Sequence, residues 1–232
     1  MASTLPGLLD ARLAADPASP LITFYDDATG ERTEVSAATF ANWVAKTANL
    51  LVDGVGTTAG ERAAVLLPVH WQSLVVIAAS WAVDLTVDLD GSPGARVAFA
   101  AERGTRPDAD DAVLLSLRPM GAALQNPDPT VIDFAAEVLA HGDRYTGPAA
   151  GASSAALPGT GHASLIAEAG TLPYAGRRML LAPKGDPPMD RGLLLASYLV
   201  PLTGGGSIVL VRHPDETKLT RLAEAERATR YP

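Results

Sequence analysis

The sequence of 232 residues contains no cysteine, so disulfides, thiolate nucleophiles and cysteine-bound metals are excluded. Its size makes such crosslinks unnecessary, because folding a chain of this length buries roughly 70–75% of its extended surface. Basic residues are also scarce: 18 Lys and Arg stand against 26 Asp and Glu, which gives a formal net charge of −8. A nucleic-acid partner requires a basic surface, and the composition therefore argues against one.

Long apolar runs are missing as well. The longest, residues 74–83, contains Ser80 and is too short to cross a membrane, which takes about 20 residues. Asp10 and Arg12 interrupt the apolar stretch near the N-terminus, which also lacks the basic start of a signal peptide. A cysteine-free composition suits the cytosol. We therefore expect a cytoplasmic protein with no membrane partner.

Strand and helix patterns alternate along most of the chain. A strand–turn–strand pattern covers residues 21–35, and an amphipathic helix follows over 36–51. Residues 63–89 read as strand, helix and strand, which is a βαβ unit. Further strands are expected over 96–100, 113–117, 178–182 and 207–211, and helices over 131–140, 163–169, 192–202 and after Asp215. This alternation predicts an α/β fold: a mostly parallel, doubly wound sheet with helices on both faces.

Two stretches look like loops. Residues 103–111 are highly charged, and residues 142–162 are rich in Gly, Pro and hydroxyl side chains. We expect a single domain over 1–232. An alternative division places two lobes, 1–141 and 163–232, on either side of the Gly/Pro-rich loop.

Three segments carry a resemblance to a known family. Glu34-Val35-Ser36 opens an amphipathic helix, and residues 201–210 form a helix–Gly–strand crossing. Residues 54–68, from Gly54-Val55 through Gly60-Glu61 to Pro68, look like a Gly-Val-x-x-Gly-Asp-x-Val-x-x-x-x-Pro run. Residues 226–229, Glu-Arg-Ala-Thr, are similar to a Glu-Arg-Val-Thr stretch that follows this crossing. In these features the chain resembles the N-terminal part of AMP-forming adenylating enzymes, which include the acyl-CoA synthetases.

The resemblance implies a Ser/Thr/Gly-rich loop that ends in Pro-Lys-Gly and wraps the phosphates of ATP. Small residues let backbone N–H groups approach the phosphates, and the Lys adds charge. The corresponding residues here, 149–162, include neither Lys nor Arg. We interpret them as a shortened, degenerate phosphate loop. Its candidate cofactor-binding residues are Ser153, Ser154, Gly159, Thr160, Gly161 and His162.

Other parts that the resemblance implies have no counterpart in the sequence. These are the adenine pocket, the Mg-binding Glu, the ribose-binding Asp and the C-terminal lid with its catalytic Lys. We therefore expect no catalytic residue, no metal site and no bound cofactor, with ATP or AMP binding left open.

Other chemistries find little support in the sequence. A serine-hydrolase elbow, Gly-x-Ser-x-Gly, is only half present at 151–155 and follows no strand. The acidic residues near 108–111 lack the Gly and Glu of an EF-hand. The glycines at 204–206 follow a helix and precede a strand, whereas a phosphate loop runs from strand to helix. We expect them to form a helix cap and a turn.

Three hypotheses about function follow. The first is a catalytically defective relative of AMP-forming acyl-CoA synthetases that acts as a binding or interaction protein for a small acyl or nucleotide ligand. The alternative is one part of a split adenylating enzyme, or a reduced enzyme that binds nucleotide or acyl-adenylate. The third is self-association as a homodimer, through surface that the rest of the family fold would cover.

Overall fold

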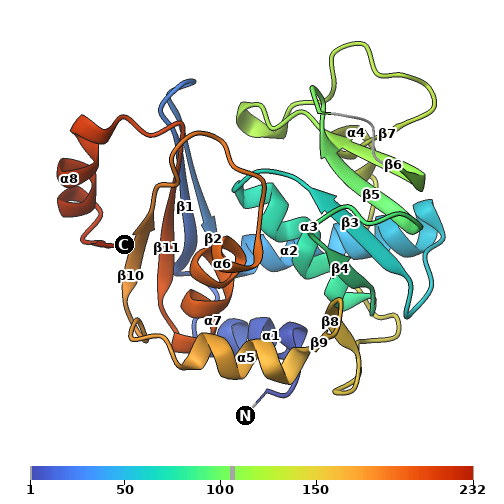
Figure 1. Cartoon of the computed structure of the whole chain (residues 1–232), viewed down its shortest axis with the longest axis horizontal. Helices are drawn as coiled ribbons and strands as arrows, with labels where there is room; N and C mark the ends of the chain where they lie inside the picture. The colour runs from blue at the N-terminus through green and yellow to red at the C-terminus, as the bar shows by residue number, and fades with distance from the viewer. Residues whose placement is uncertain (1, 105–107, 232) are drawn as a thin grey trace.

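The computed structural model describes residues 2–104 and 108–231, and in these residues the strands form two five-stranded sheets and a small hairpin (Figure 1). Helices lie between the sheets and on the far side of one of them. None of the described helices is long and apolar enough to cross a membrane.

Sheet A joins the two ends of the chain. Its order is β12-β10-β11-β1-β2, and every neighbouring pair is parallel except β1 and β2. The parallel pairing of β1 with β11 places the start of the chain beside its last third. The strands are β1 (Pro20–Asp26), β2 (Glu31–Ser36), β10 (Arg178–Leu181), β11 (Ser207–Arg212) and β12 (Thr229–Arg230).

Sheet B is built from the middle of the chain and is parallel throughout, in the order β4-β3-β5-β6-β7. Its strands are β3 (Arg62–Leu66), β4 (Thr86–Asp88), β5 (Ala95–Ala101), β6 (Ala109–Leu115) and β7 (Ile132–Asp133). A separate antiparallel hairpin consists of β8 (Ala155–Leu157) and β9 (Thr160–Gly161).

Helices α2 and α3 separate the two sheets (Figure 1). The described helices are α1 (Leu5–Ala15), α2 (Ala37–Asn49) with the π-helical turn η1 (Leu50–Val55), α3 (Trp71–Ala82), the 3-10 turn η2 (Pro119–Gly121), α4 (Phe134–Val138), α5 (His162–Gly170), α6 (Arg191–Leu194), the π-helical turn η3 (Leu195–Leu199), α7 (Val200–Gly204) and α8 (Glu216–Ala225).

One large apolar core joins both sheets through these middle helices. Helix α3 is buried on all sides: every residue from Trp71 to Trp81 is buried, and most of them are apolar, as expected of a helix enclosed by other elements. On the other face of sheet A, Leu219 of α8 packs against Leu180 and Val209. Sheet A is therefore covered on both faces, and the predicted doubly wound α/β fold is confirmed.

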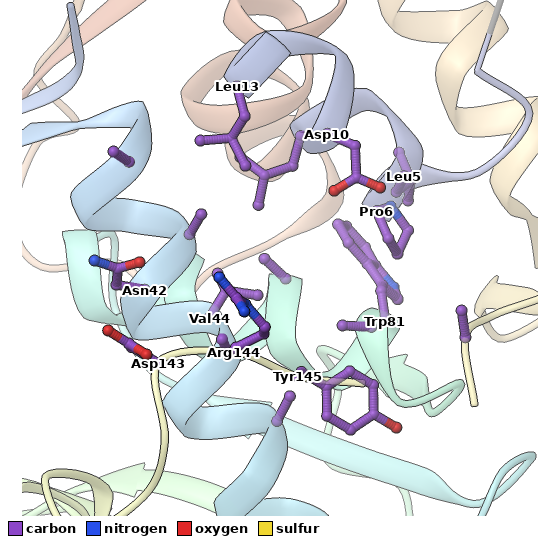
Figure 2. Close-up of a pocket in the computed structure, with 18 of the residues that line it drawn as sticks. Leu5, Pro6, Asp10, Leu13, Asn42, Val44, Trp81, Asp143, Arg144 and Tyr145 are labelled. Atoms are coloured by element: carbon purple, nitrogen blue, oxygen red, sulfur yellow. The ribbon is translucent and has the colours of Figure 1, made fainter. Parts of the chain in front are cut away.

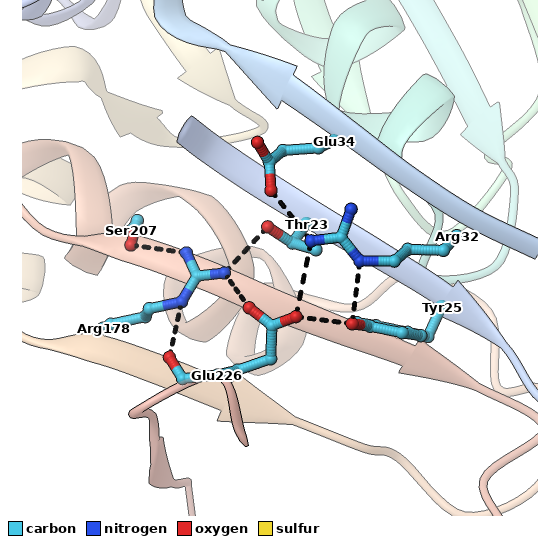
Figure 3. A network of polar contacts seen from close by, with 7 residues as sticks. All are labelled: Thr23, Tyr25, Arg32, Glu34, Arg178, Ser207 and Glu226. Carbon is cyan, nitrogen blue, oxygen red and sulfur yellow. Dashed lines mark hydrogen bonds and ion pairs between the residues drawn. The ribbon is translucent and has the colours of Figure 1, made fainter. Parts of the chain in front are cut away.

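A polar network on this outer face ties the chain after α8 to sheet A (Figure 3). Arg178 donates hydrogen bonds to Ser207 Oγ at 3.0 Å and Thr23 Oγ1 at 2.8 Å, and its NH2 nitrogen lies 2.5 Å from Glu226 Oε2. The Tyr25 hydroxyl donates to the other Glu226 oxygen. Burial raises the pKa of Glu226, but the hydrogen bonds from Tyr25 and Arg178 outweigh it and lower the pKa below its usual value.

Two local predictions are wrong in their boundaries. The helix predicted over 131–140 is only the short α4, because Ile132 pairs in β7 and Asp133 caps the helix by accepting the N–H groups of residues 135 and 136. In the charged stretch 103–111, residues 105–107 lie outside the described residues. Asp111 belongs to β6, where an ion pair with Arg96 compensates its charge.

The glycine run 204–206 is a helix cap followed by a turn, as predicted. Gly205 ends α7 with a φ of +70°, which glycine adopts without steric cost. Gly206 lies so close to the neighbouring chain that an added Cβ would be 2.1 Å from the carbonyl oxygen of Arg177.

Candidate functional site

The predicted phosphate loop is a closed hairpin. Leu157 of β8 pairs with Thr160 of β9, which leaves a turn of two residues, Pro158 and Gly159. Gly159 has a φ of +69°, as tight hairpin turns require. Gly161 then precedes α5 as its N-cap residue. The backbone N–H groups of a loop long enough to wrap a phosphate are therefore replaced by a turn of minimal length.

His162 begins α5 and anchors the N-terminal helix. Its side chain is completely buried, and its Nδ1 accepts the backbone N–H of Leu5 at 3.2 Å. Its Nε2 has no hydrogen-bond partner in the described part of the chain. Burial lowers the pKa of His162, so the ring is neutral near pH 7. These contacts give His162 a structural role in the hairpin.

The other predicted residues lie around the same hairpin. Ser154 Oγ accepts the N–H of Gly151 at 3.0 Å within the turn before β8, and Ser153 is exposed in that turn. Thr160 Oγ1 accepts a hydrogen bond from Arg191 at 3.1 Å, but Arg191 also pairs with Glu168. The fold thus brings all six predicted residues together, and Arg191, the cation that reaches them among the described residues, is already paired with a carboxylate.

Trp81 fixes the first strand of the hairpin. Its Nε1 donates to the carbonyl oxygen of Ala156 at 2.8 Å, in a buried position. Thr86, the first residue of β4, donates to the carbonyl of Ala155 at 3.4 Å. The hairpin therefore lies at the amino end of β4, whereas ligands of parallel sheets usually bind at the carboxyl ends.

A second candidate, missed by the sequence analysis, lies at the carboxyl end of sheet A. His213 Nδ1 is 2.9 Å from Asp26 Oδ1, and Asp26 is only 3% exposed. Arg212 Nε donates to Asp186 Oδ1 at 2.7 Å, and His213 Nε2 is 3.9 Å from Asp186 Oδ2. The sequence does contain a signal for this cluster, because polar residues directly follow the apolar strands whose ends meet here.

The topology explains why these groups meet. The connection from β10 to β11 runs through α6 and α7 on the inner face of sheet A, whereas α8, between β11 and β12, packs on the outer face. Connections that leave on opposite faces open a crevice at the carboxyl ends of the strands. In this protein the acids and bases at the carboxyl ends of the strands pair with one another. Across the described ranges, no group of three or more His, Asp or Glu side chains could hold a metal ion.

His70 lies buried near this edge and caps α3. Its Nδ1 accepts the N–H of Gln72 at 3.1 Å, and its ring packs edge-on against Phe24 at 4.4 Å between centroids. Burial, together with the positive charge of Arg212, lowers the pKa of His70 to about 3. His70 is therefore a neutral cap at physiological pH, and protonation would destroy its acceptor.

The third candidate is a cavity of about 460 Å³ between α1, α2, α3 and residues 143–149 (Figure 2). This volume is within the usual range for small-molecule sites, roughly 300–1,000 Å³. Its walls are mainly apolar and include Leu5, Leu9, Leu13, Val44, Trp81 and Tyr198. Polar side chains near its opening are Asp10, Asn42, Asp143 and Arg144.

Hydrogen bonds hold residues 143–149 over α2. Lys46 Nζ donates to the carbonyl of His141 at 2.6 Å, and Asn49 Nδ2 donates to the carbonyls of Gly142 at 2.8 Å and Arg144 at 3.1 Å. These bonds fix the backbone of Arg144 and leave its guanidinium without a partner among the residues described. The cavity wall is therefore ordered by contacts that do not use its charged side chains.

Comparison with known proteins gives two findings. No protein-family model matches the sequence. A protein of Mycobacterium tuberculosis (strain ATCC 25618 / H37Rv), named a TIGR03089 family protein, is 37% identical over 243 residues, which cover 98% of this chain and 98% of that protein.

Several solved structures share the fold. The N-terminal domain of FACL13 from Mycobacterium tuberculosis has a TM-score of 0.70 at 14% identity, over 97% of this chain and 61% of that chain. An acyl-CoA synthetase of Brucella canis gives 0.70 at 16%, over 97% and 46%. The anthranilate CoA ligase AuaEII, in complex with anthranoyl-AMP, gives 0.68 at 12%, over 98% and 50%. The chain thus spans about half the length of these proteins, and the predicted resemblance to their N-terminal part is confirmed at the level of fold.

Proposed function

Because this chain belongs to the TIGR03089 family and has the fold of the N-terminal part of acyl-CoA synthetases, we propose that it is a relative of AMP-forming ligases that binds a small molecule without adenylating it. The observation that carries the proposal is the closed hairpin at 155–161, where the resemblance implies a phosphate loop.

Adenylation requires a triphosphate to be held in place and the charge on its α-phosphate to be neutralised. Losing a single preorganised donor of this kind typically costs about 10²–10³ in rate. The hairpin offers a turn of two residues, and Arg191, which reaches Thr160, is engaged with Glu168. Within the described hairpin, neither a loop of backbone N–H groups nor an uncommitted cation is therefore present to meet these two requirements.

A binding role is supported by the cavity between α1, α2 and α3. It combines apolar walls with a few polar groups near its opening, as small-molecule sites usually do. None of the residues paired at the carboxyl end of sheet A, Asp26, Asp186, Arg212 and His213, lines this cavity. An acyl or nucleotide ligand, as predicted from the sequence, stays a proposal.

The test is a pyrophosphate-exchange assay with ATP, Mg²⁺ and a panel of carboxylic acids, with an active acyl-CoA synthetase as the positive control. We expect no exchange above the protein-free background. A Lys184→Ala variant, which lacks the lysine after β10, serves as the matched control. If the native chain catalyses exchange and this variant does not, the proposal is contradicted.

A second candidate is one part of a split adenylating enzyme. It is favoured by the length relation, since the chain spans 46–61% of these three ligase structures. A partner protein would then supply the adenine pocket and the lid. This candidate predicts that ATP, AMP or an acyl-adenylate raises the melting temperature, and the absence of a shift with all three would exclude it.

A further inference from the structure

One buried hydrogen bond joins the starts of two helices beside the cavity. The backbone N–H of Leu5, the first residue of α1, donates to Nδ1 of His162, the first residue of α5, at 3.2 Å. Leu5, Pro6 and Leu9 of α1 line the cavity, and α1 lies alongside α5 in Figure 1. His162 therefore holds the first turn of the helix that forms one wall of the cavity.

Helix α1 has few other attachments. Two of its 11 residues, Leu5 and Leu9, are buried, and its other side chains are half-buried or exposed. An isolated helix of this length is marginal in water, because its few hydrogen bonds barely offset the cost of forming the first turn. The helix therefore depends on its docked position, and segments with so few buried contacts open more readily than the core.

The contact between His162 and Leu5 needs a neutral imidazole. Because Nδ1 accepts from Leu5, the ring proton is on Nε2, which is buried and finds no acceptor among the described residues. A second proton, on Nδ1, would set two donors against each other. It would also put positive charge at the N-terminal ends of both α1 and α5, where the helix dipoles disfavour it. The docked position of α1 and a protonated His162 therefore oppose each other.

The charges around His162 do not remove this conflict. Asp84, which follows α3, raises the pKa of His162, but burial is the larger effect and lowers the pKa overall. Helix α3, residues 155–161, η3 and α7 contain no charged side chain, and burial keeps Tyr198 of η3 neutral by raising its pKa. The charged side chains of α1 and α5, each more than one helical turn from the end at His162, are Asp10, Arg12 and Glu168.

We propose that His162 is a pH-sensitive latch on the cavity: its neutral ring holds the first turn of α1 in place, and its protonation releases α1 and opens the cavity on that side. The proposal rests on the proposed function, because it describes how occupancy of the same cavity is regulated. A ligand is retained at neutral pH and released in acid.

The direction follows from the lowered pKa of His162 in the docked state. Above pH 6.5 the ring is neutral whether α1 is docked or released, so the latch contributes fully. Below pH 6.5 the released state takes up the proton while the docked state does not. The fraction of released α1 then rises by up to about tenfold per pH unit, until the pH reaches the lowered pKa of the docked state.

Hydrogen exchange separates release of α1 from unfolding of the whole chain. Amide protection is measured at pH 7, 6 and 5 in the native chain, with correction for the intrinsic dependence of exchange on pH. We expect the protection of the α1 amides to fall by about tenfold between pH 7 and pH 5. At each pH the α1 amides should be less protected than those of α3, because α1 opens while the core stays folded.

Variants assign this fall to the latch. His162→Asn keeps an acceptor for the Leu5 N–H but does not titrate, so the fall in α1 protection should shrink to less than about twofold. The matched control, His141→Asn, removes a histidine that does not contact α1 in the described structure and should keep the native fall. If His162→Asn does not fold, His162→Gln, which also carries an amide oxygen, takes its place.

An introduced thiol tests whether the cavity itself opens, because the chain contains no cysteine of its own. Ala78→Cys places the thiol on the cavity wall, where Ala78 is 5% exposed, and Ala167→Cys places it at an exposed position of α5 as the control. Both react with 4,4′-dithiodipyridine. The rate at position 78 relative to position 167 should rise by about tenfold between pH 7 and pH 5, and by less than about twofold when His162→Asn is added.

Three results would refute the latch. They are unchanged α1 protection between pH 7 and pH 5, equal protection of α1 and α3 at every pH, and a native dependence on pH in His162→Asn in either assay. Neither assay contains ATP or a carboxylic acid, so none of these results bears on the proposed function. Pyrophosphate exchange by the pure chain would in turn contradict the proposed function and leave the behaviour of α1 unaffected.

Discussion

His70 should make the stability of the fold depend on pH well above the range in which carboxylates titrate. Its neutral ring accepts the Gln72 N–H as the cap of α3. A proton on Nδ1 would place a donor against a donor, at the helix end where the macrodipole already disfavours positive charge. Burial and the nearby Arg212 lower the pKa of His70 to about 3 in the fold, from 6.5 in the unfolded chain.

The direction in which stability changes with pH depends on whether the folded or the unfolded chain takes up the proton at the higher pH. Above pH 6.5 His70 is neutral in both states, and its contribution is fully present. Between pH 6.5 and about 3 the unfolded chain is protonated while the folded chain is not, so the free energy of unfolding falls as pH falls. At 1.36 kcal/mol per pH unit, the loss from pH 7 to pH 5 is about 2 kcal/mol.

Urea denaturation at pH 7, 6 and 5 measures this loss in the native chain and in His70→Asn. Asparagine retains an acceptor for the Gln72 N–H and is a strong helix cap, but it does not titrate. The variant should be less stable at pH 7 by about 1–3 kcal/mol, because the contact with Phe24 is lost. Its further loss between pH 7 and pH 5 should be smaller than that of the native chain by about 2 kcal/mol.

His141→Asn is the control for the loss of a histidine that caps no described helix. Burial of His162 acts in the same direction as that of His70, so some dependence on pH should persist in His70→Asn. If native chain and His70→Asn lose the same stability between pH 7 and pH 5, the reasoning about a neutral buried cap is refuted.

Three further predictions concern packing and assembly. Gly206→Ala should lower the free energy of unfolding by about 3 kcal/mol or more, because the new Cβ would lie 2.1 Å from a backbone oxygen. Gly30→Ala, at a φ of +75° with open space around it, should lower it by only about 1–2 kcal/mol in the same urea assay. Glu226→Gln should lower the free energy of unfolding by about 1–3 kcal/mol, because it weakens the network in Figure 3. The control Glu216→Gln, at an exposed ion pair, should lower it by less than about 0.5 kcal/mol. Equal losses in the two variants would contradict a special role for the network. The homodimer predicted from the sequence should appear in light scattering as twice the mass of the chain, although Leu139 is the large hydrophobic side chain that the described residues expose.

Elements with strong local signals could be predicted from the sequence. The run 63–67 before Pro68 gave β3, and the largely apolar run from Trp71 gave α3, because elements that are buried on all sides contain few polar residues. The pairing of β1 with β11 could not be predicted in this way, since it joins residues almost 190 positions apart, such as Ile22 and Ile208. Only the family resemblance indicated that long-range arrangement.

The candidate site was less predictable, for a physical reason. His162 was identified from its neighbours in sequence, but its surroundings in the fold include Leu5, which lies 157 positions away along the chain. The cavity needs α1, α2, α3 and residues 143–149 together, and no local pattern marks Tyr198 as a residue that lines it. Sequence periodicity indicates which faces of the helices are buried. A cavity, in contrast, forms where side chains from several helices leave space between them, and no single helix pattern encodes that space.

The turn at Pro158-Gly159 has an evolutionary implication. Leu157 and Thr160 are held as paired neighbours by the strands on either side, so a longer loop could leave and return at these two points without moving the rest of the fold. Each doubling of loop length costs only about 0.6 kcal/mol in closure entropy. On the proposed function, a change in the length of this one turn would alter the segment where the resemblance implies a phosphate loop and leave the two paired strands in place.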